Sequence, residues 1–357
     1  MIDFLIIGGG IAGVSAAARL VELGSVVVLE TEDQLAYHAS GRSAAMFEES
    51  YGKPSTIALN AASKCFHVDA DVLSPRGLMM VGNKDNAATF ENDRTVMQLD
   101  LITMDEAVDF VPITCRKAVD RAAYHSEAWD IDTDKLLQTF AKMVRAKGGQ
   151  INTKAGVSSI SRITTGWEVN TRTTSYFARN LVNAAGAWVD NIAMMAGITP
   201  LGFSPKRRSM ARMPAPGGHD VRQWPMLFGP GETWYAKPDA GALIVSPADE
   251  DKVEPHDAYP DEMTLAEGLM RYENNVTEPI VRLLASWAGL RTFAPDGTLV
   301  LGRDPVDDRF IWCAGQGGYG MQSSPAASQL LADIIAERQP ELDAQTVAAL
   351  SPARFSA

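Results

Sequence analysis

Residues 4–13 read Phe4-Leu5-Ile6-Ile7-Gly8-Gly9-Gly10-Ile11-Ala12-Gly13, an apolar run that leads directly into a glycine-rich turn. A continuous apolar run of this length is typical of a strand buried on both faces of a parallel sheet. The glycines match the pattern G-x-G-x-x-G: Gly8 permits the tight turn, Gly10 lets the backbone approach a pyrophosphate, and Gly13 lets helix and strand pack closely. The stretch predicts the first half of a βαβ unit that binds a dinucleotide.

The residues that follow complete this unit. Residues 14–23 are Ala-rich and helical in pattern, Gly24 is expected to end the helix, and residues 26–29 form a second apolar strand that closes with Glu30. The N-terminus of the helix offers unpaired N–H groups and a partial positive charge to a pyrophosphate. The carboxylate of Glu30 can accept hydrogen bonds from ribose hydroxyls and would repel the additional phosphate of NADP. A glycine-rich turn in some other α/β protein would leave Glu30 unexplained.

The polar loop after Glu30 favours FAD over NAD as the dinucleotide. Residues 37–45 read Tyr37-His38-Ala39-Ser40-Gly41-Arg42-Ser43-Ala44-Ala45, which is not a further strand and helix. Small residues let such a loop run closely past a flat ring system, and Arg42 with Ser40 and Ser43 can meet phosphate or ring carbonyl oxygens. A plain surface loop is the alternative interpretation, and NAD is the alternative cofactor.

Two later segments return to the pattern of a buried strand, small residues and a helix. They read Asn180-Leu181-Val182-Asn183-Ala184-Ala185-Gly186-Ala187-Trp188 and Phe310-Ile311-Trp312-Cys313-Ala314-Gly315-Gln316-Gly317-Gly318-Tyr319-Gly320. We expect Ser324 to be the N-cap of the second helix, with Pro325 at its first position. A helix N-terminus opened by glycines suits an electron-rich group, such as the pyrimidine edge of a reduced flavin.

The chain is therefore predicted to be an α/β protein, with a Rossmann-like FAD-binding domain and an interleaved mixed-sheet α+β substrate domain. The second domain is richer in Pro, Met, Trp and Tyr, and has strand-like stretches at 233–237 and 242–245. We assign 1–78, 137–205 and 285–357 to the FAD-binding domain, and 79–136 and 206–284 to the substrate domain, which forms a lid over the flavin.

Composition narrows the class of protein. The 357 residues are 46% apolar and carry a net charge of −12, which argues against nucleic acid or an anionic membrane surface as a partner. Cys65, Cys115 and Cys313 are scattered and lack C-x-x-C spacing, so we expect neither a metal site nor a disulfide framework. The sequence has no uninterrupted apolar run of about 18 residues, so we expect no membrane span. No targeting segment is apparent, so we expect a cytoplasmic location.

The motifs together resemble a known family. Gly8–Gly13, the loop at 37–45, residues 183–188, Trp287-Ala288-Gly289-Leu290-Arg291 and residues 316–320 are similar to the D-amino-acid oxidase/glycine oxidase superfamily of FAD-dependent oxidoreductases. Within it, the chain most resembles bacterial FAD-dependent D-arginine dehydrogenases. That likeness is carried by Pro205-Lys206-Arg207-Arg208-Ser209, Trp224-Pro225-Met226-Leu227, Lys237-Pro238-Asp239-Ala240-Gly241 and Ser246-Pro247-Ala248. It spans nearly the whole chain.

The resemblance implies a reaction and a set of catalytic residues. Arg208 and Arg291 would hold the substrate carboxylate, because a guanidinium meets a carboxylate bidentately and stays charged. The hydroxyls of Tyr51 and Tyr235 would orient a D-amino acid. A hydride would pass from its α-carbon to flavin N5, and the imino acid would hydrolyse to a 2-oxo acid and ammonia. A quinone or another carrier would then accept the electrons. Without the resemblance, Arg208 would be part of a solvated basic run, and both tyrosines core or rim aromatics.

The same resemblance predicts the FAD contacts. They are Gly8, Gly10, Ile11, Ala12, Gly13, Glu30, His38, Ser40, Arg42, Ser43, Ala44, Ala185, Gly186, Trp188, Gly317, Gly318, Tyr319, Gly320 and Met321. Some relatives that oxidise methylated glycines bind flavin covalently through a histidine placed like His38. The likeness to D-arginine dehydrogenases instead implies non-covalent FAD, which is our expectation.

Departures from the family pattern concern the substrate pocket, which we expect to include Met46, Glu48, Leu78 and Gly318. Arginine-preferring members have an acidic residue where Leu78 stands after Ser74-Pro75-Arg76-Gly77. Leu78 would leave a distal cation unpaired, so the pocket is predicted to favour neutral, apolar side chains. Met46 replaces the usual histidine. Glu48 replaces a small hydroxyl residue, and could restore some preference for cations or bind an amine directly.

Three functions remain open from the sequence. The first is a D-amino-acid dehydrogenase, the second an oxygen-using oxidase of glycine, sarcosine or another secondary amine, and the third a non-catalytic dinucleotide-binding protein. The paired arginines and the intact flavin-side segments argue against the third.

Overall fold

The apolar run at the N-terminus forms β1 (Ile2–Ile7) near the centre of the first sheet of the computed structural model, which describes residues 1–356. β1 pairs in parallel with β2 (Val26–Leu29) on one side and β12 (Ser175–Asn183) on the other. Phe4 and Ile6 pack into a core on one face of the sheet, whereas Leu5 and Ile7 pack into a second core on the opposite face. The prediction of a strand buried on both faces is confirmed.

The first sheet is built from segments that lie far apart in the sequence. Its order is β10 (Val157–Ile163), β11 (Gly166–Thr171), β12, β1, β2 and β9 (Gln150–Asn152), with β19 (Phe310–Ala314) paired to β12 and β18 (Val300–Arg303) paired to β19. Helices α1 (Ile11–Leu20), α5 (Thr133–Ala146) and α8 (Gly320–Ile335) contribute to the core on one face. The β10–β11 hairpin and α6 (Val189–Met195) contribute to the core on the other. The predicted α/β class is confirmed.

A second sheet is mixed, with mostly antiparallel strands. Its order is β17 (Ala285–Phe293), β13 (Ser204–Pro214), β16 (Ala242–Ser246), β15 (Tyr235–Asp239), β14 (Met226–Phe228), β5 (Leu78–Gly82), β7 (Arg121–His125) and β6 (Asp100–Ile102). A small third sheet is formed by β3 (Met46–Phe47), β8 (Trp129–Ile131) and β4 (Leu73–Pro75). The strand-like stretches expected near 233–237 and 242–245 correspond to β15 and β16.

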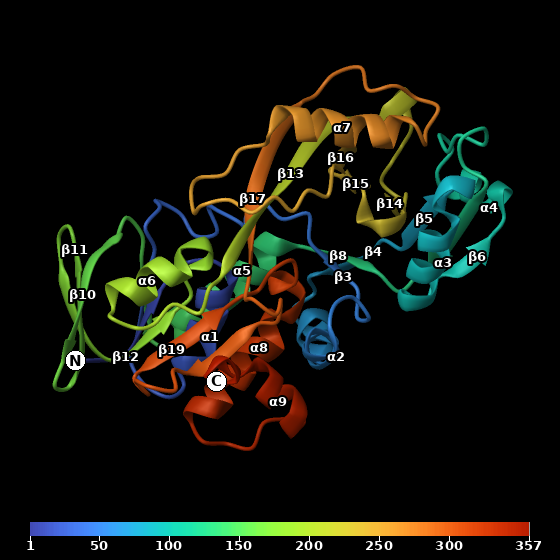
Figure 1. The fold of residues 1–357 in the computed structure, drawn as a ribbon. Coiled ribbons are helices and arrows are strands. Elements are labelled where there is room, and N and C mark those ends of the chain that lie inside the picture. The colour runs from blue at the N-terminus through green and yellow to red at the C-terminus, as the bar shows by residue number, and fades with distance from the viewer. Residues whose placement is uncertain (357) are drawn as a thin grey trace.

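The long strands β13 and β17 connect the two parts of the molecule. These two antiparallel strands pair continuously, from Ser204 opposite Phe293 to Arg212 opposite Ala285. They run from the neighbourhood of the first sheet to α7 (Glu262–Glu273), a helix that packs on the second sheet (Figure 1). Any group bound where the two parts meet can therefore contact both.

The remaining elements are α2 (Pro54–Asp69), α3 (Ala87–Val96), α4 (Met104–Phe110), α9 (Ala344–Leu350), η1 (Lys84–Asn86), η2 (Gly186–Trp188), η3 (Pro216–Gly218), η4 (Pro230–Glu232) and η5 (Pro352–Phe355).

The expected bounds of two helices are wrong. α1 begins at Ile11 and ends at Leu20, earlier than the expected residues 14–23. α8 begins at Gly320, so Ser324 is not its N-cap and Pro325 lies in its second turn. Pro325 has no N–H to donate to the carbonyl of Met321, and the Ser324 hydroxyl donates to that carbonyl instead at 3.2 Å. A local side-chain bond thus lets the helix continue through the proline.

Side chains from α2 stabilise the helix on either side of this proline. The N–H of Ala326 donates to the hydroxyl of Ser63 at 3.1 Å, and Nε2 of His67 donates to the carbonyl of Gln322 at 2.8 Å. Ser63 and His67 are fully buried. The main-chain groups of α8 that the proline disturbs are therefore paired with α2, a segment about 260 residues earlier in the chain.

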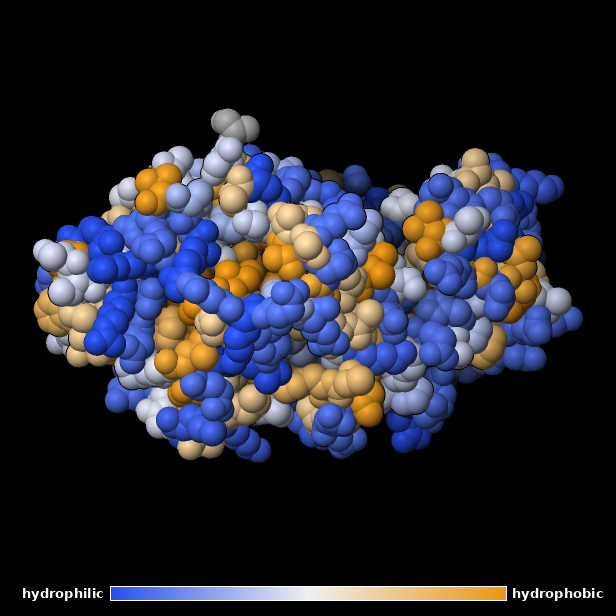
Figure 2. Space-filling view, turned by 90° about the horizontal axis from the view of Figure 1, so that it is seen from below, coloured by the Kyte–Doolittle hydropathy of each residue, from blue (hydrophilic) through white to orange (hydrophobic). Residues whose placement is uncertain are grey.

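The face of the molecule that is seen from below is largely hydrophilic (Figure 2). In the view from below, apolar residues form small patches separated by polar ones (Figure 2). Across residues 1–356, no helix combines the length and the apolar character needed to cross a membrane.

Candidate active site

The first of three adjoining cavities surrounds the glycine-rich turn. It has a volume of about 410 Å³ and lies at the ends of β1, β2 and β12. Nine of the expected FAD contacts line it, namely Gly8, Gly10, Glu30, His38, Ser40, Arg42, Ala185, Gly186 and Trp188. The carboxyl ends of parallel strands are where ligands bind in open α/β sheets.

The glycines of the turn are required by close backbone approach. Gly8 has φ +115°, and a methyl group added to it would lie 2.3 Å from the carbonyl oxygen of Ala184. A methyl group at Gly13 would lie 2.0 Å from the carbonyl oxygen of Gly8. Gly10 is the N-cap of α1 and supplies no side-chain acceptor, so the positive end of the helix faces the cavity.

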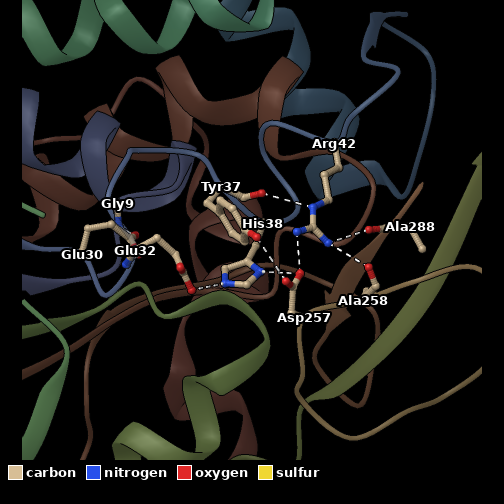
Figure 3. A network of polar contacts seen from close by, with 9 residues as sticks. All are labelled: Gly9, Glu30, Glu32, Tyr37, His38, Arg42, Asp257, Ala258 and Ala288. Carbon is tan, nitrogen blue, oxygen red and sulfur yellow. Dashed lines mark hydrogen bonds and ion pairs between the residues drawn. The ribbon is translucent and has the colours of Figure 1, made fainter. Parts of the chain in front are cut away.

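Glu30 lies beside this turn with its orientation fixed. Its Oε2 accepts the N–H of Gly9 at 2.6 Å and its Oε1 accepts the N–H of Glu32 at 2.9 Å (Figure 3). A carboxylate has about four acceptor sites, so both oxygens can still accept a ribose hydroxyl. The geometry fits the expected role of Glu30.

Arg42 lines the cavity, but most of its N–H groups already donate hydrogen bonds within the protein. Its guanidinium donates to the carbonyls of Tyr37, Ala258 and Ala288 at 3.1, 2.9 and 3.0 Å, and to the carboxylate of Asp257 at 2.5 Å (Figure 3). The hydrogen bond from Arg42 is the main reason that the pKa of Asp257 lies below its ordinary value. Arg42 therefore joins the polar loop to residues 257–258 and to β17, and no local pattern in the sequence pointed to Asp257 as its partner.

His38 lies at the nucleotide end of the site. Its Nε2 is 3.0 Å from Oε1 of Glu32 and its Nδ1 is 3.8 Å from Oδ1 of Asp257 (Figure 3). Its ring lies 4.8 Å from the ring of Trp188. It lines the first cavity and not the second.

The second cavity continues from the first and has a volume of about 120 Å³. Its wall includes the expected contacts Ile11, Ala12, Ser43, Gly317, Gly318, Gly320 and Met321, together with Gly10, Ser40, Arg42 and Gly186, which also line the first cavity. A methyl group at Gly318 would lie 3.0 Å from Nη1 of Arg291, so the glycine leaves room for that guanidinium. Thr292 adds a buried hydroxyl to this wall.

The third cavity, of about 110 Å³, contains every residue expected at the substrate. It is lined by Met46, Glu48, Tyr51, Leu78, Arg208, Tyr235, Arg291 and Gly318, with Ser43 and Ala44. Of these, Ser43, Arg208, Arg291 and Gly318 also line the second cavity. Of the expected FAD contacts, only Gly13 and Tyr319 line none of the three; Gly13 packs within the turn, and the Tyr319 ring lies 5.3 Å from that of Tyr51.

The two arginines lie on neighbouring strands and on the same face of the second sheet. Arg208 in β13 stands opposite Gly289, two residues before Arg291 in β17. Arg208 is 3% exposed and donates to Oε1 of Glu250 at 2.9 Å. Burial opposes the charge of Arg291, but the phenol groups of Tyr235 and Tyr51 and the carboxylates of Glu232 and Glu250 outweigh it and raise its pKa. The guanidinium of Arg291 is thus held charged beside the cavity.

Several residues of the third cavity were missed from the sequence. They are Met97, Met226, Phe228, Glu232, Trp234 and Gln322. Glu232 accepts a hydrogen bond from the hydroxyl of Tyr51 at 3.1 Å and has φ +50°, an uncommon value for a residue other than glycine. Gln322 lies four residues after the expected contact Gly318, in the first turn of α8, and this short spacing was the only local signal for any of the six.

The cavities also collect buried polar atoms that lack partners. Within residues 1–356, Nε of Arg208, Oγ1 of Thr292, Nε2 of Gln322 and Oε2 of Glu48 are buried without a hydrogen-bond partner. Such atoms are costly in a folded protein unless a ligand or water satisfies them. With the glycine turn, the helix N-terminus and Glu30 at the other end, the residues present fit an extended dinucleotide whose ring system ends beside the two arginines.

Comparison with known proteins identifies the fold and the family. A family model described as "FAD dependent oxidoreductase" (DAO) matches residues 3–334. FAD-dependent oxidoreductase domain-containing protein 1 of Xenopus laevis is 23% identical, over 94% of this chain and 79% of that protein.

Solved structures share the architecture of both parts. L-proline dehydrogenase from P. horikoshii has a TM-score of 0.83 at 21% identity, covering 99% of this chain and 97% of that one. Glycine oxidase from Geobacillus kaustophilus has a TM-score of 0.82 at 20% identity, covering 98% of each chain. At these identities the likeness concerns the fold.

Proposed function

Because the chain belongs to the DAO family of FAD-dependent oxidoreductases, we propose that it is a dehydrogenase of D-amino acids with neutral, mainly apolar side chains. The observation that carries this proposal is the convergence of Arg208 and Arg291 on the wall that the second and third cavities share. Two guanidinium groups there fit the carboxylate of an amino acid, and would hold its α-carbon next to the ring system.

Each residue of the pocket has a task in this proposal. FAD, when bound, would supply the two-electron acceptor for oxidation of the α-carbon. Arg208 and Arg291 pin the carboxylate, and the hydroxyls of Tyr51 and Tyr235 orient the amine end. The imino acid product is released and hydrolyses in water. We propose a quinone or another carrier as the electron acceptor.

The apolar wall supports neutral substrates. Leu78 is 5% exposed and lines the cavity together with Met97, Met226 and Phe228. A distal cation placed against these side chains would lose its hydration without gaining a partner.

Replacing Leu78 with glutamate is expected to raise kcat/KM for D-arginine and D-lysine by about 10- to 100-fold, because a hydrogen bond to a charged group contributes about 1.5–3 kcal/mol. Steady-state kinetics with an artificial electron acceptor measure this change. Leu78→Gln is the matched control, which adds polarity without charge and should give a much smaller gain. If Leu78→Glu gains nothing on either cationic substrate, Leu78 does not face the substrate side chain.

We further propose that FAD is bound non-covalently. His38 is engaged by Glu32 and Asp257 at the nucleotide end and does not line the second cavity. Acid precipitation of the purified protein should leave all the yellow colour in the supernatant, whereas a yellow pellet would require a covalent bond.

An oxygen-using oxidase of glycine or sarcosine is the second candidate. The small volume of the third cavity, about 110 Å³, favours it because a small amine would fill that space. The two candidates differ in whether peroxide forms during turnover.

The decisive experiment mixes the anaerobic protein with D- and L-amino acids, sarcosine and simple amines, and follows the flavin absorbance. Bleaching by apolar D-amino acids but not by their L-forms is the expected result. Bleaching by sarcosine or glycine alone would establish the second candidate. A colourless protein that retains NAD would overturn the proposal altogether.

A further inference from the structure

Glu48 is a carboxylic acid built into the wall of the third cavity. It directly follows β3, whose two residues alternate: Phe47 is fully buried in the core, whereas Met46 lines the cavity. Glu48 lines the cavity on the same side as Met46 and is 7% exposed. A charged residue so deeply buried ordinarily has a partner.

The side chain is anchored at one oxygen and free at the other. Its Oε1 accepts the N–H of Ser50 at 3.0 Å, and its own N–H donates to Oε1 of Gln322 at 3.1 Å. Its Oε2 is enclosed and has no partner among the described residues. The free oxygen thus has a fixed position within a side chain that lines the cavity.

Nearby charges do not compensate this carboxylate. Burial raises the pKa of Glu48 to about 7, the Ser50 N–H opposes the rise, and the charge of Glu49 adds to it. Glu49 itself is paired with Lys64 at 2.9 Å. On α2, His67 donates to the main chain of Gln322, and burial keeps its pKa low.

Arg208, Arg291 and Tyr51 line the same cavity. Arg208 is paired with Glu250, and the Tyr51 hydroxyl donates to Glu232. The side chains that complete the wall, such as Leu78, Met97 and Met226, offer no charge. Within residues 1–356 none of these groups forms an ion pair with Glu48, so a cationic group bound in the cavity would supply the partner that its carboxylate lacks.

We propose that the free oxygen of Glu48 binds an ammonium group of the substrate. This inference rests on the proposed function and deepens it: the arginines recognise the carboxylate and Glu48 recognises a positively charged nitrogen. The nitrogen is either the α-ammonium, which every amino acid carries, or a terminal ammonium on the side chain. In both cases the ionised form of Glu48 is the binding form.

The first test measures binding without turnover. 2-Aminoisobutyrate has no α-hydrogen and cannot be oxidised, and pivalate is the same shape with a methyl group in place of the ammonium. Dissociation constants come from the change in the flavin spectrum. Glu48→Gln keeps an oxygen that can accept the Ser50 N–H. We expect it to weaken the binding of 2-aminoisobutyrate by about 10- to 100-fold and to leave the dissociation constant of pivalate unchanged. Glu49→Gln removes the same charge outside the cavity and should change neither ligand.

The second test locates the nitrogen. D-Norleucine and D-ornithine have side chains of equal length that end in a methyl and an ammonium group. If D-ornithine alone no longer reduces the flavin of Glu48→Gln, and the variant still binds 2-aminoisobutyrate, then Glu48 binds the terminal ammonium group. Loss on both substrates, with weakened 2-aminoisobutyrate, assigns the α-ammonium. If Glu48→Gln matches the wild-type protein with every ligand and substrate, the proposal is overturned.

Wild-type protein alone gives an independent check. Its affinity for 2-aminoisobutyrate should rise as the pH increases through about 7 and Glu48 ionises, while its affinity for pivalate shows no such rise. An affinity for 2-aminoisobutyrate that is flat over this range overturns the proposal even if Glu48→Gln fails to fold. Failure of the proposed function looks different: the wild-type flavin would be reduced by no amino acid, while the binding measurements would still report on Glu48.

Discussion

Replacing Arg291 with leucine is expected to lower kcat/KM for the best D-amino-acid substrate by about 10²- to 10³-fold, because removing one partner of a desolvated ion pair costs about 2–5 kcal/mol. The guanidinium lies on the wall shared by the second and third cavities, against the backbone of Gly318. No hydrogen bond within residues 1–356 occupies it, so its donors are free for a carboxylate. The loss should fall on substrate Kd and also on the limiting rate of flavin reduction, since a loosely held α-carbon is poorly aligned.

A graded series makes this result specific. Arg291→Lys keeps the charge but not the planar fork, so it should recover only part of the loss. Arg212→Met is the matched control: Arg212 lies on β13, is paired with Asp239 at 2.7 Å, and lines none of the three cavities. Anaerobic stopped-flow reduction measures Kd and rate separately. If Arg291→Leu binds its substrates with the wild-type Kd values, the substrate carboxylate does not bind at Arg291.

Replacing Gly13 with alanine is expected to yield protein with little or no bound FAD and a Tm lower by roughly 5 °C or more. The added methyl group would lie 2.0 Å from the Gly8 carbonyl oxygen, where only backbone atoms could move aside. Opening the turn displaces the start of α1, and with it the N–H groups that face the nucleotide cavity. The ratio of flavin to protein absorbance and a thermal melt measure the two effects.

Gly10→Ala separates cofactor binding from folding. Gly10 has φ −79°, which alanine adopts readily, and the nearest atom to its added methyl group is the Ser40 hydroxyl at 3.1 Å. The apoprotein of Gly10→Ala should therefore melt like wild type, while its affinity for FAD falls because the methyl group projects where the pyrophosphate approaches. Full yellow colour in Gly13→Ala would show that the turn tolerates a side chain, and would contradict the packing described here.

The site and its walls differ in how far the sequence could predict them. Every residue expected at the substrate lines the third cavity, because the likeness to a family supplied positions that spacing alone could not. Five of the residues missed from that cavity lie on α3, β14 and η4 or just beyond them, whereas Gln322 lies on α8, so the cavity forms only where the two parts of the molecule meet. Their local patterns are those of ordinary apolar or turn residues.

The sequence by itself determined the βαβ unit, because its requirements are local. The contact between Gly8 and Gly13 spans five residues, and the alternation of Phe4 and Ile6 against Leu5 and Ile7 follows from strand geometry alone. The local expectation failed at Pro325, because the Ser324 hydroxyl bonds the carbonyl that the proline leaves without a donor and Ser63 of α2 accepts the N–H of Ala326.

Only the tertiary structure decided how the polar groups are paired. Arg42 was expected to serve the cofactor, but Asp257, 215 residues away, takes one of its donors; Tyr51 meets Glu232 181 residues away. Glu48, by contrast, lines the third cavity, and one of its oxygens is buried with no partner among residues 1–356. The pairing of a buried charge depends on which distant groups folding brings within about 3 Å, and sequence spacing carries no record of that distance.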